Sequence, residues 1–134
     1  MNITIPCYYT QKYKTKADKT FLLSLNWYRN AFHHQQNAVK QHMHELIAPQ
    51  LANMSPIDGT YSVTYHYYFK SSVSDMTNVI PMASKWLNDV LQSHKLVPND
   101  NVKYLIAEHH YVATQDKLNP RIEATIHPTK EQLC

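Results

Sequence analysis

The hydrophobic residues of this chain repeat with two different periods, and the change of period constrains the fold more than any other feature. Residues 60 to 70 are dense in Tyr, Val, Thr and Phe, which suit the pleated surface of a strand. Residues 78 to 94 instead carry apolar side chains at helical spacing, in two adjacent rows: Val79, Ala83, Trp86 and Val90, with Ile80, Leu87 and Leu91. The sequence therefore predicts a strand followed by a long helix with a broad buried face.

The segment before this pair is expected to supply a short strand, a basic loop and a first helix. Asn2 to Ile5 alternates as a strand that Pro6 ends. The polar, lysine-rich stretch Gln11 to Lys19 predicts a mobile basic loop over about residues 11 to 20. Residues 22 to 47 carry one apolar stripe, which predicts a single continuous helix: Leu25, Tyr28, Phe32, Val39, Met43 and Leu46.

The segment after the second helix is expected to supply two closing strands. Val102 to Ala113 and Arg121 to His127 are predicted to pair as a hairpin around the polar loop 114 to 120. Residues 128 to 134 are expected to form a short C-terminal tail. The order β-α-β-α-β-β predicts one α+β domain over residues 1–134, with a mixed sheet packed against two main helices.

Composition excludes several classes of protein. Hydrophobic residues make up 43% of the chain and charged residues 17%, which argues against disorder. No apolar run approaches the roughly 20 residues of a membrane span, and the start lacks a secretory pattern, so we expect a soluble cytoplasmic protein. The single glycine, Gly59, excludes P-loop ATPases and Rossmann dehydrogenases. Cys7 and Cys134 have no zinc or disulfide spacing and are expected to be free thiols.

The charge pattern favours an anionic partner. The net charge is +3 with histidine neutral. The polar side of the first helix forms a stripe along which a DNA backbone could lie: Asn26, Asn30, His33, Asn37, Lys40 and His44, with Arg29 beside it. The basic loop adds Lys12, Lys14 and Lys16. The alternative interpretation is an ordinary solvated helix face.

The histidines do not form the pattern of a zinc hydrolase. His33-His34, His42 with His44, and His109-His110 lack an accompanying Glu in a metalloprotease-like arrangement. The sequence therefore does not predict zinc hydrolysis.

Three short motifs occur in an order that resembles a known family. Ser74-Asp75-Met76-Thr77-Asn78 precedes the second helix, which carries Lys85 and Asp89, and Val97-Pro98-Asn99-Asp100-Asn101-Val102 opens the next strand. Together they resemble the RusA-type resolvases, phage crossover junction endodeoxyribonucleases with an Asp-x-Asp-Asn motif, a helix and an Asp-Asp pair before a strand. Leu25-Asn26-Trp27-Tyr28-Arg29-Asn30, with Lys40, is similar to the N-terminal segment of many phage members. The resemblance covers about residues 20 to 127.

The resemblance implies a RusA-like fold and a Mg²⁺-dependent homodimeric nuclease that recognises four-way DNA junctions and makes paired cuts. It places such a protein in the cytoplasm of a bacterial host, encoded by a phage or prophage. Asp75 matches the first aspartate of the motif and Asp100 the aspartate before the third strand, which makes them the implied metal ligands. Asn78 is the asparagine of the motif, and Lys85 or Lys103 would assist electrostatically. Mg²⁺ typically needs only one or two protein carboxylates.

Two positions depart from the family pattern. Thr77 stands where the second motif aspartate belongs, and Asn99 stands where the first member of the later acidic pair belongs. Some phage-type relatives carry a small hydroxyl residue at the position of Thr77. Two functions therefore stay open: an active structure-selective endonuclease, or a degenerate relative that binds branched DNA or a host protein without cutting.

Each aspartate also has a purely structural interpretation. Pro81 is tolerated in the first turn of a helix, so the second helix is expected to begin near Thr77 or Asn78, where Asp75 would cap it. Asp100 lies in a Pro-Asn-Asp-Asn turn that starts a strand.

The spacing of the acids restricts how they meet. Asp89 lies roughly 20 Å along the helix from Asp75, so we expect a surface acid or a partner of Lys85. A helix of about 16 residues separates its ends by roughly 24 Å. One metal can join Asp75 and Asp100 only if the chain folds back along the helix, or if the acids meet across a two-fold axis.

Overall fold

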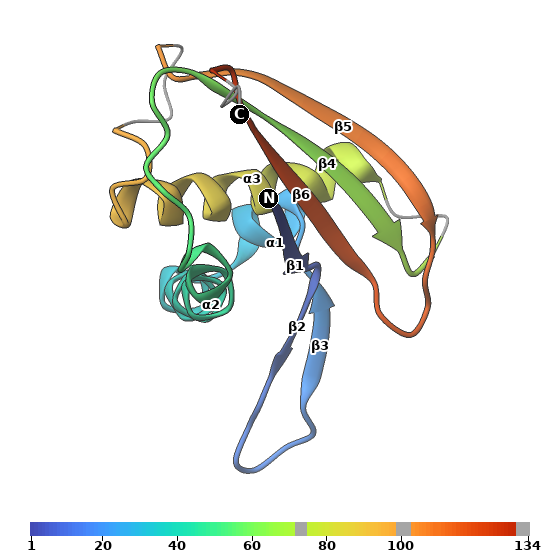
Figure 1. Cartoon of the computed structure of the whole chain (residues 1–134). Helices are drawn as coiled ribbons and strands as arrows, with labels where there is room; N and C mark the ends of the chain where they lie inside the picture. Colours follow the sequence, from blue (N-terminus) through green and yellow to red (C-terminus); the bar gives the residue numbers. More distant parts are fainter. Residues whose placement is uncertain (72–74, 99–102, 131–134) are drawn as a thin grey trace.

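The helices and strands form one α+β domain in the computed structural model, which describes residues 1–71, 75–98 and 103–130. A four-stranded mixed sheet is accompanied by a small hairpin and three α-helices in these ranges (Figure 1). In chain order the elements are β1 (Asn2–Pro6), β2 (Tyr8–Gln11), β3 (Lys19–Leu22), α1 (Leu25–Asn30), α2 (His33–Ile47), the 3-10 helix η1 (Ala48–Leu51), β4 (Tyr61–Phe69), α3 (Met76–Ser93), β5 (Leu105–Gln115) and β6 (Arg121–Pro128). The predicted α+β class is confirmed.

The four strands of the main sheet lie in the order β1-β6-β4-β5. β4 is parallel to β5, with Tyr65 opposite His110, and antiparallel to β6, with Tyr65 opposite Ala124. The predicted hairpin between the last two strands is therefore wrong, because β4 lies between them. The cause is the β4-α3-β5 crossover, which places β5 parallel to β4 along one edge of that strand. β6 therefore pairs with the opposite edge of β4.

The helices cover one face of this sheet. Alternate residues of β4 are buried on that face, including Tyr61, Tyr65 and Tyr67. α3 contributes the largest helical part of the core, with Trp86 only 2% exposed. Cys7 is a free thiol, as predicted. It is also buried, and burial raises the pKa of the thiol to about 12. Cys134 lies outside the described residues.

The first helix is broken in two, contrary to the prediction of one continuous helix. Ala31 and Phe32 between α1 and α2 are extended, with ψ of 145° and 148°. The side-chain amide of Gln36 donates to the carbonyl oxygens of Tyr28 and Ala31 and so satisfies the end of α1. The break turns Phe32 to solvent, 76% exposed, and Leu46 is 39% exposed, so neither belongs to the buried stripe.

The predicted basic loop is the tip of a β-hairpin. β2 and β3 pair antiparallel from Tyr8 opposite Leu22 to Gln11 opposite Lys19, and residues 12–18 join them. The hairpin extends away from the main sheet (Figure 1). The predicted position of the tail also needs correction, because Pro128 ends β6 and Thr129 N donates to Thr60 O at 2.9 Å. No helix in the described ranges is long and apolar enough to cross a membrane.

Candidate functional site

Asp75 caps the amino end of α3. Its Oδ1 accepts hydrogen bonds from Thr77 N at 2.9 Å and from Thr77 Oγ1 at 2.7 Å. These bonds hold the pKa of the Asp75 carboxyl below its usual value, so the group is ionised at neutral pH. The structural interpretation of Asp75 as a helix cap is confirmed. Because both bonds use Oδ1, capping leaves Oδ2 of this exposed side chain as an acceptor for a cation.

Asn78 and Lys85 lie at different distances from Asp75 along the axis of α3. Asn78 is one turn away, and its backbone N donates to Asp75 O at 3.0 Å. Lys85 is exposed but about 15 Å further along the helix axis than Asp75. Asn78 therefore lies within one helical turn of Asp75, whereas Lys85 does not. α3 also begins at Met76, so Pro81 lies past the first turn in which the sequence analysis expected it.

Asp100 and Asn99 lie outside the described residues. Pro98, the described residue before them, follows α3, which ends at Ser93, and Val97 N donates to Leu91 O near that end at 3.4 Å. Asp75 is at the amino end of this helix of 18 residues. The helix is about 27 Å long at its usual rise. Within the described ranges, no three His, Cys, Asp or Glu side chains are grouped so that they could hold a metal.

Lys12, Lys14 and Lys16 are grouped at the exposed tip of the β2–β3 hairpin. Lys12 Nζ lies 3.8 Å from Asp18 Oδ2, and Lys16 Nζ lies 4.2 Å from the centre of the Tyr13 ring. Exposed ion pairs of this kind are weak, so they do not prevent the lysines from meeting phosphate. Three lysines against one aspartate leave the tip with an excess of positive charge.

The other predicted DNA contacts do not form one line. Arg29 lies on α1, whereas His33 and Lys40 lie on α2, and all three are exposed. The continuous polar stripe predicted across residues 26 to 44 is therefore wrong, because the chain is extended between the two helices. His44, at the end of that stripe, is half-buried, and its Nε2 has no hydrogen-bond partner in the described structure.

His44 instead faces the second long helix. Burial lowers the pKa of its imidazole, and the charge of Lys40 lowers it further, while Asp89 acts in the opposite direction. Asp89 thus interacts electrostatically with α2. Among the ion pairs of the described residues, none joins Asp89 to Lys85, although the sequence offered that pairing.

A polar cluster that local sequence patterns did not predict lies between α3 and β5. Ser84 Oγ donates to Glu108 Oε2 at 2.9 Å, and His110 Nε2 lies 3.5 Å from Glu108 Oε1. Tyr61 OH donates to Asn88 Oδ1 at 2.6 Å, and Asn88 Nδ2 donates to the Ser84 carbonyl at 2.9 Å. The sequence run Glu108-His109-His110 was visible, but only the pairing of β5 decides which histidine faces the helix.

The hydroxyl of Tyr65 lies beside the Ser84 and Asn88 side chains of this cluster, and neither contact has the geometry of a good hydrogen bond. Tyr65 is fully buried, and burial raises the pKa of its phenol, so the group stays neutral. The cluster is not a nucleophilic triad, because the Ser84 hydroxyl bonds to the carboxylate rather than to the imidazole that would take its proton. Its polar groups act as a structural link between α3 and the sheet.

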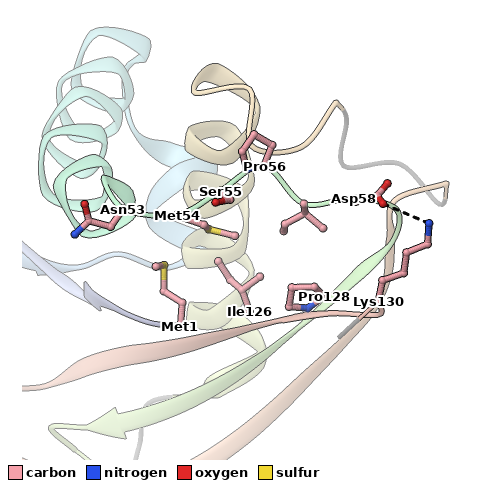
Figure 2. A pocket seen from close by; sticks show the side chains of 10 residues that line it. Met1, Asn53, Met54, Ser55, Pro56, Asp58, Ile126, Pro128 and Lys130 are labelled. Carbon is pink, nitrogen blue, oxygen red and sulfur yellow. Dashed lines mark hydrogen bonds and ion pairs between the residues drawn. The ribbon is translucent and has the colours of Figure 1, made fainter. Parts of the chain in front are cut away.

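A hollow of about 740 Å³ opens between the start of β1, the loop before β4 and the end of β6 (Figure 2). Met1, Met54 and Ile126 supply much of its apolar lining. The charged side chains among its lining residues are Asp58 and Lys130, which pair with each other at 3.5 Å. None of the site residues predicted from the sequence lies in this hollow.

No protein-family model matches this chain, and no curated protein is significantly similar to it.

Proposed function

We propose that the protein is a Mg²⁺-dependent structure-selective endodeoxyribonuclease of the RusA type that cuts four-way DNA junctions. The observation that carries the proposal is the exposed, ionised carboxylate of Asp75, whose Oδ2 is not used in capping α3. Hard divalent cations prefer such oxygens. The order of the motifs at residues 74–78 and 97–102 supplies the class of enzyme.

The residues around Asp75 fit a magnesium site that is completed by water and substrate phosphate. One or two protein carboxylates are enough for such a site. Bound Mg²⁺ supplies a water of lowered pKa and neutralises charge on the reacting phosphate. Asn78, one turn beyond Asp75, offers a side-chain amide that donates to a phosphate oxygen. The amino end of α3 adds the partial positive charge that favours phosphate binding.

The hairpin tip supplies the contact to the DNA backbone away from the reacting phosphate. Lys12, Lys14 and Lys16 lie on an arm that extends from the main sheet (Figure 1). Arg29, His33 and Lys40 add exposed basic groups on α1 and α2. Contacts of lysine and arginine to phosphate give affinity without reading sequence, as recognition of junction shape requires.

The proposed enzyme is a homodimer with a site shared between protomers. Asp75 and Pro98 lie near opposite ends of α3, a helix about 27 Å long. Under the proposal, the Asp100 that completes each site therefore comes from the second protomer. The proposal prefers this arrangement to the fold-back of the chain along α3, which the sequence left open.

Cleavage of a labelled four-way junction, with and without Mg²⁺, tests the activity. We expect paired cuts that need both the junction and the metal. Co-expressed subunits carrying Asp75→Asn and Asp100→Asn test the sharing of sites. Mixed dimers regain one intact site if sites are shared and so nick the junction, whereas sites within one subunit leave every mixed dimer inactive.

A junction-binding protein without nuclease activity is the second candidate, and Thr77 favours it. Its hydroxyl donates to Asp75 at the position where the family pattern has a second carboxylate, so it adds no anionic ligand. This candidate predicts tight junction binding that Mg²⁺ does not change, with no cut strands.

A further inference from the structure

β5 is a long edge strand whose pairing with β4 shifts register near both of its ends but is regular between them. Among the described residues it pairs on one side only, with β4. Its 11 residues, LIAEHHYVATQ, contain no lysine, arginine or proline. Natural sheets commonly place such residues on long exposed edges. β5 instead exposes three large hydrophobic side chains, Ile106 by 54%, Tyr111 by 52% and Val112 by 54%.

We propose that β5 pairs antiparallel with β5 of a second copy of this chain, about a two-fold axis at His109. Residues equally distant from His109 then face each other. Ile106 faces the partner's Val112, Ala107 faces the partner's Tyr111, and Glu108 faces the partner's His110. Apart from His109, which faces the partner's His109 on the axis, each of these opposed pairs joins two apolar groups or an acid with a base, the pairs that stabilise neighbouring strands.

Moving the axis by one residue loses this complementarity. With the axis at His110, Glu108 would face the partner's Val112 and His109 would face the partner's Tyr111. Ile106 would lose its apolar partner and face the partner's Thr114. The pairing of β5 with β4 is also regular from Ala107 to Val112, so the strand around His109 presents an even edge.

The two-fold arrangement has a consequence for the proposed active site, and in this respect it rests on the proposed function. α3 runs from the end of β4 to the start of β5, opposite in direction to β5 (Figure 1). Antiparallel pairing of two β5 strands therefore brings the amino end of one α3 to the same end of the joined sheet as the carboxyl end of the other. Asp75 then lies on the side where the partner's Pro98 and the partner's Lys103 lie.

The oligomeric state tests the interface without reference to nuclease activity. We expect the wild-type chain to sediment as a dimer. Val112→Lys places two desolvated charges in each symmetric interface and should raise the dimer dissociation constant by about a hundredfold or more. Leu118→Lys is the matched control, because Leu118 is 98% exposed in the loop after β5 and should leave the dimer intact.

Disulfide cross-linking tests the register. His109→Cys, in a Cys134→Ser background, places two thiols opposite each other on the axis, within the Cα separation that a disulfide needs. Oxidised glutathione should then give a covalent dimer. Ala113→Cys is the control, because its copies lie eight strand positions apart, about 26 Å, and should not cross-link.

The possible results separate this inference from the nuclease proposal. A wild-type monomer at all concentrations, or a Val112→Lys dimer that sediments like wild type, overturns the β5 interface. Junction cleavage that survives in such a protein leaves the nuclease proposal standing. A dimer that cross-links through His109→Cys but cuts no junction supports the interface and contradicts the nuclease.

Discussion

Thr77 donates two hydrogen bonds to one oxygen of Asp75, from its backbone N at 2.9 Å and from its hydroxyl at 2.7 Å. A position that the RusA-type pattern gives to a second carboxylate thus holds a donor to the first. The bonds keep Asp75 ionised and fix it at the start of α3. This relationship makes Asp75 both a structural cap and the best candidate ligand, and the following predictions separate the two roles.

Asp75→Asn should abolish Mg²⁺-dependent cleavage while junction binding and folding stay close to wild type. Asparagine is as good a helix cap as aspartate, so α3 keeps its first turn, but the neutral amide is a poor Mg²⁺ ligand. Asp58→Asn is the control, since Asp58 is an exposed acid paired with Lys130 in the separate hollow. Gel assays of binding and cleavage measure the effect, and full activity of Asp75→Asn would refute the site.

Thr77→Val should raise the pKa of the Asp75 carboxyl, because it removes the hydroxyl that gives the largest lowering effect. A lowered pKa keeps the carboxylate charged until the pH falls through that value. As the pH falls, the variant should therefore lose the stabilisation of α3 by the charged Asp75 cap at a higher pH than wild type. Any metal-dependent activity should be lost at the same higher pH. NMR titration of the Asp75 carboxyl measures this shift. Thr77→Ser keeps the hydroxyl and should titrate like wild type.

Replacing Lys12, Lys14 and Lys16 together with Gln should weaken junction binding and flatten its dependence on salt. Each lysine that touches phosphate contributes nearly one unit to the slope of log affinity against log salt concentration. Lys130→Gln removes a cation far from the hairpin and serves as the control. Fluorescence anisotropy at several salt concentrations decides the result, and an unchanged slope would show that the hairpin does not contact DNA.

The change from tyrosine to phenylalanine should have different effects on stability at two positions of β4. Tyr61→Phe leaves the buried Asn88 Oδ1 without its donor and should destabilise the fold by about 1–3 kcal/mol. Tyr65→Phe removes a buried hydroxyl whose contacts with Ser84 and Asn88 lack good hydrogen-bond geometry, and it should be neutral or slightly stabilising. Urea unfolding measures both changes. A loss of stability in Tyr65→Phe equal to that in Tyr61→Phe would mean that its hydroxyl is bonded after all.

The protein should lose stability as the pH falls below about 6.5, and His44 should account for part of the loss. The pKa of His44 is lowered in the folded state, so the unfolded chain takes up the proton at higher pH. Neutral His44 therefore stabilises the fold fully above the pKa that this histidine has in the unfolded chain. This stabilisation is lost as the pH falls toward the lower pKa of His44 in the folded protein. Unfolding of His44→Gln should depend less on pH in this range, while the exposed control His33→Gln should behave like wild type.

Local patterns in the chain were sufficient for the elements that carry the candidate site. β4 and α3 were predicted within a few residues, because strand composition and helical spacing of apolar residues are properties of short segments. The cap formed by Asp75 was also predicted, since a side chain bonds there to a backbone group two residues away. The break after α1 was missed, because the same spacing of apolar residues continues across Ala31 and Phe32.

Only tertiary structure decided which strands meet and which polar groups come together. β5 pairs with β4 rather than β6, because the direction of the chain after α3 is set by packing of that helix on the sheet. That pairing turns Glu108 and His110 toward Ser84, which is 24 residues from Glu108 in the chain. The sequence determined the elements and the identity of Asp75 through local interactions. The position of β5 at the edge of the described sheet depends on contacts between distant segments, which no local pattern contains.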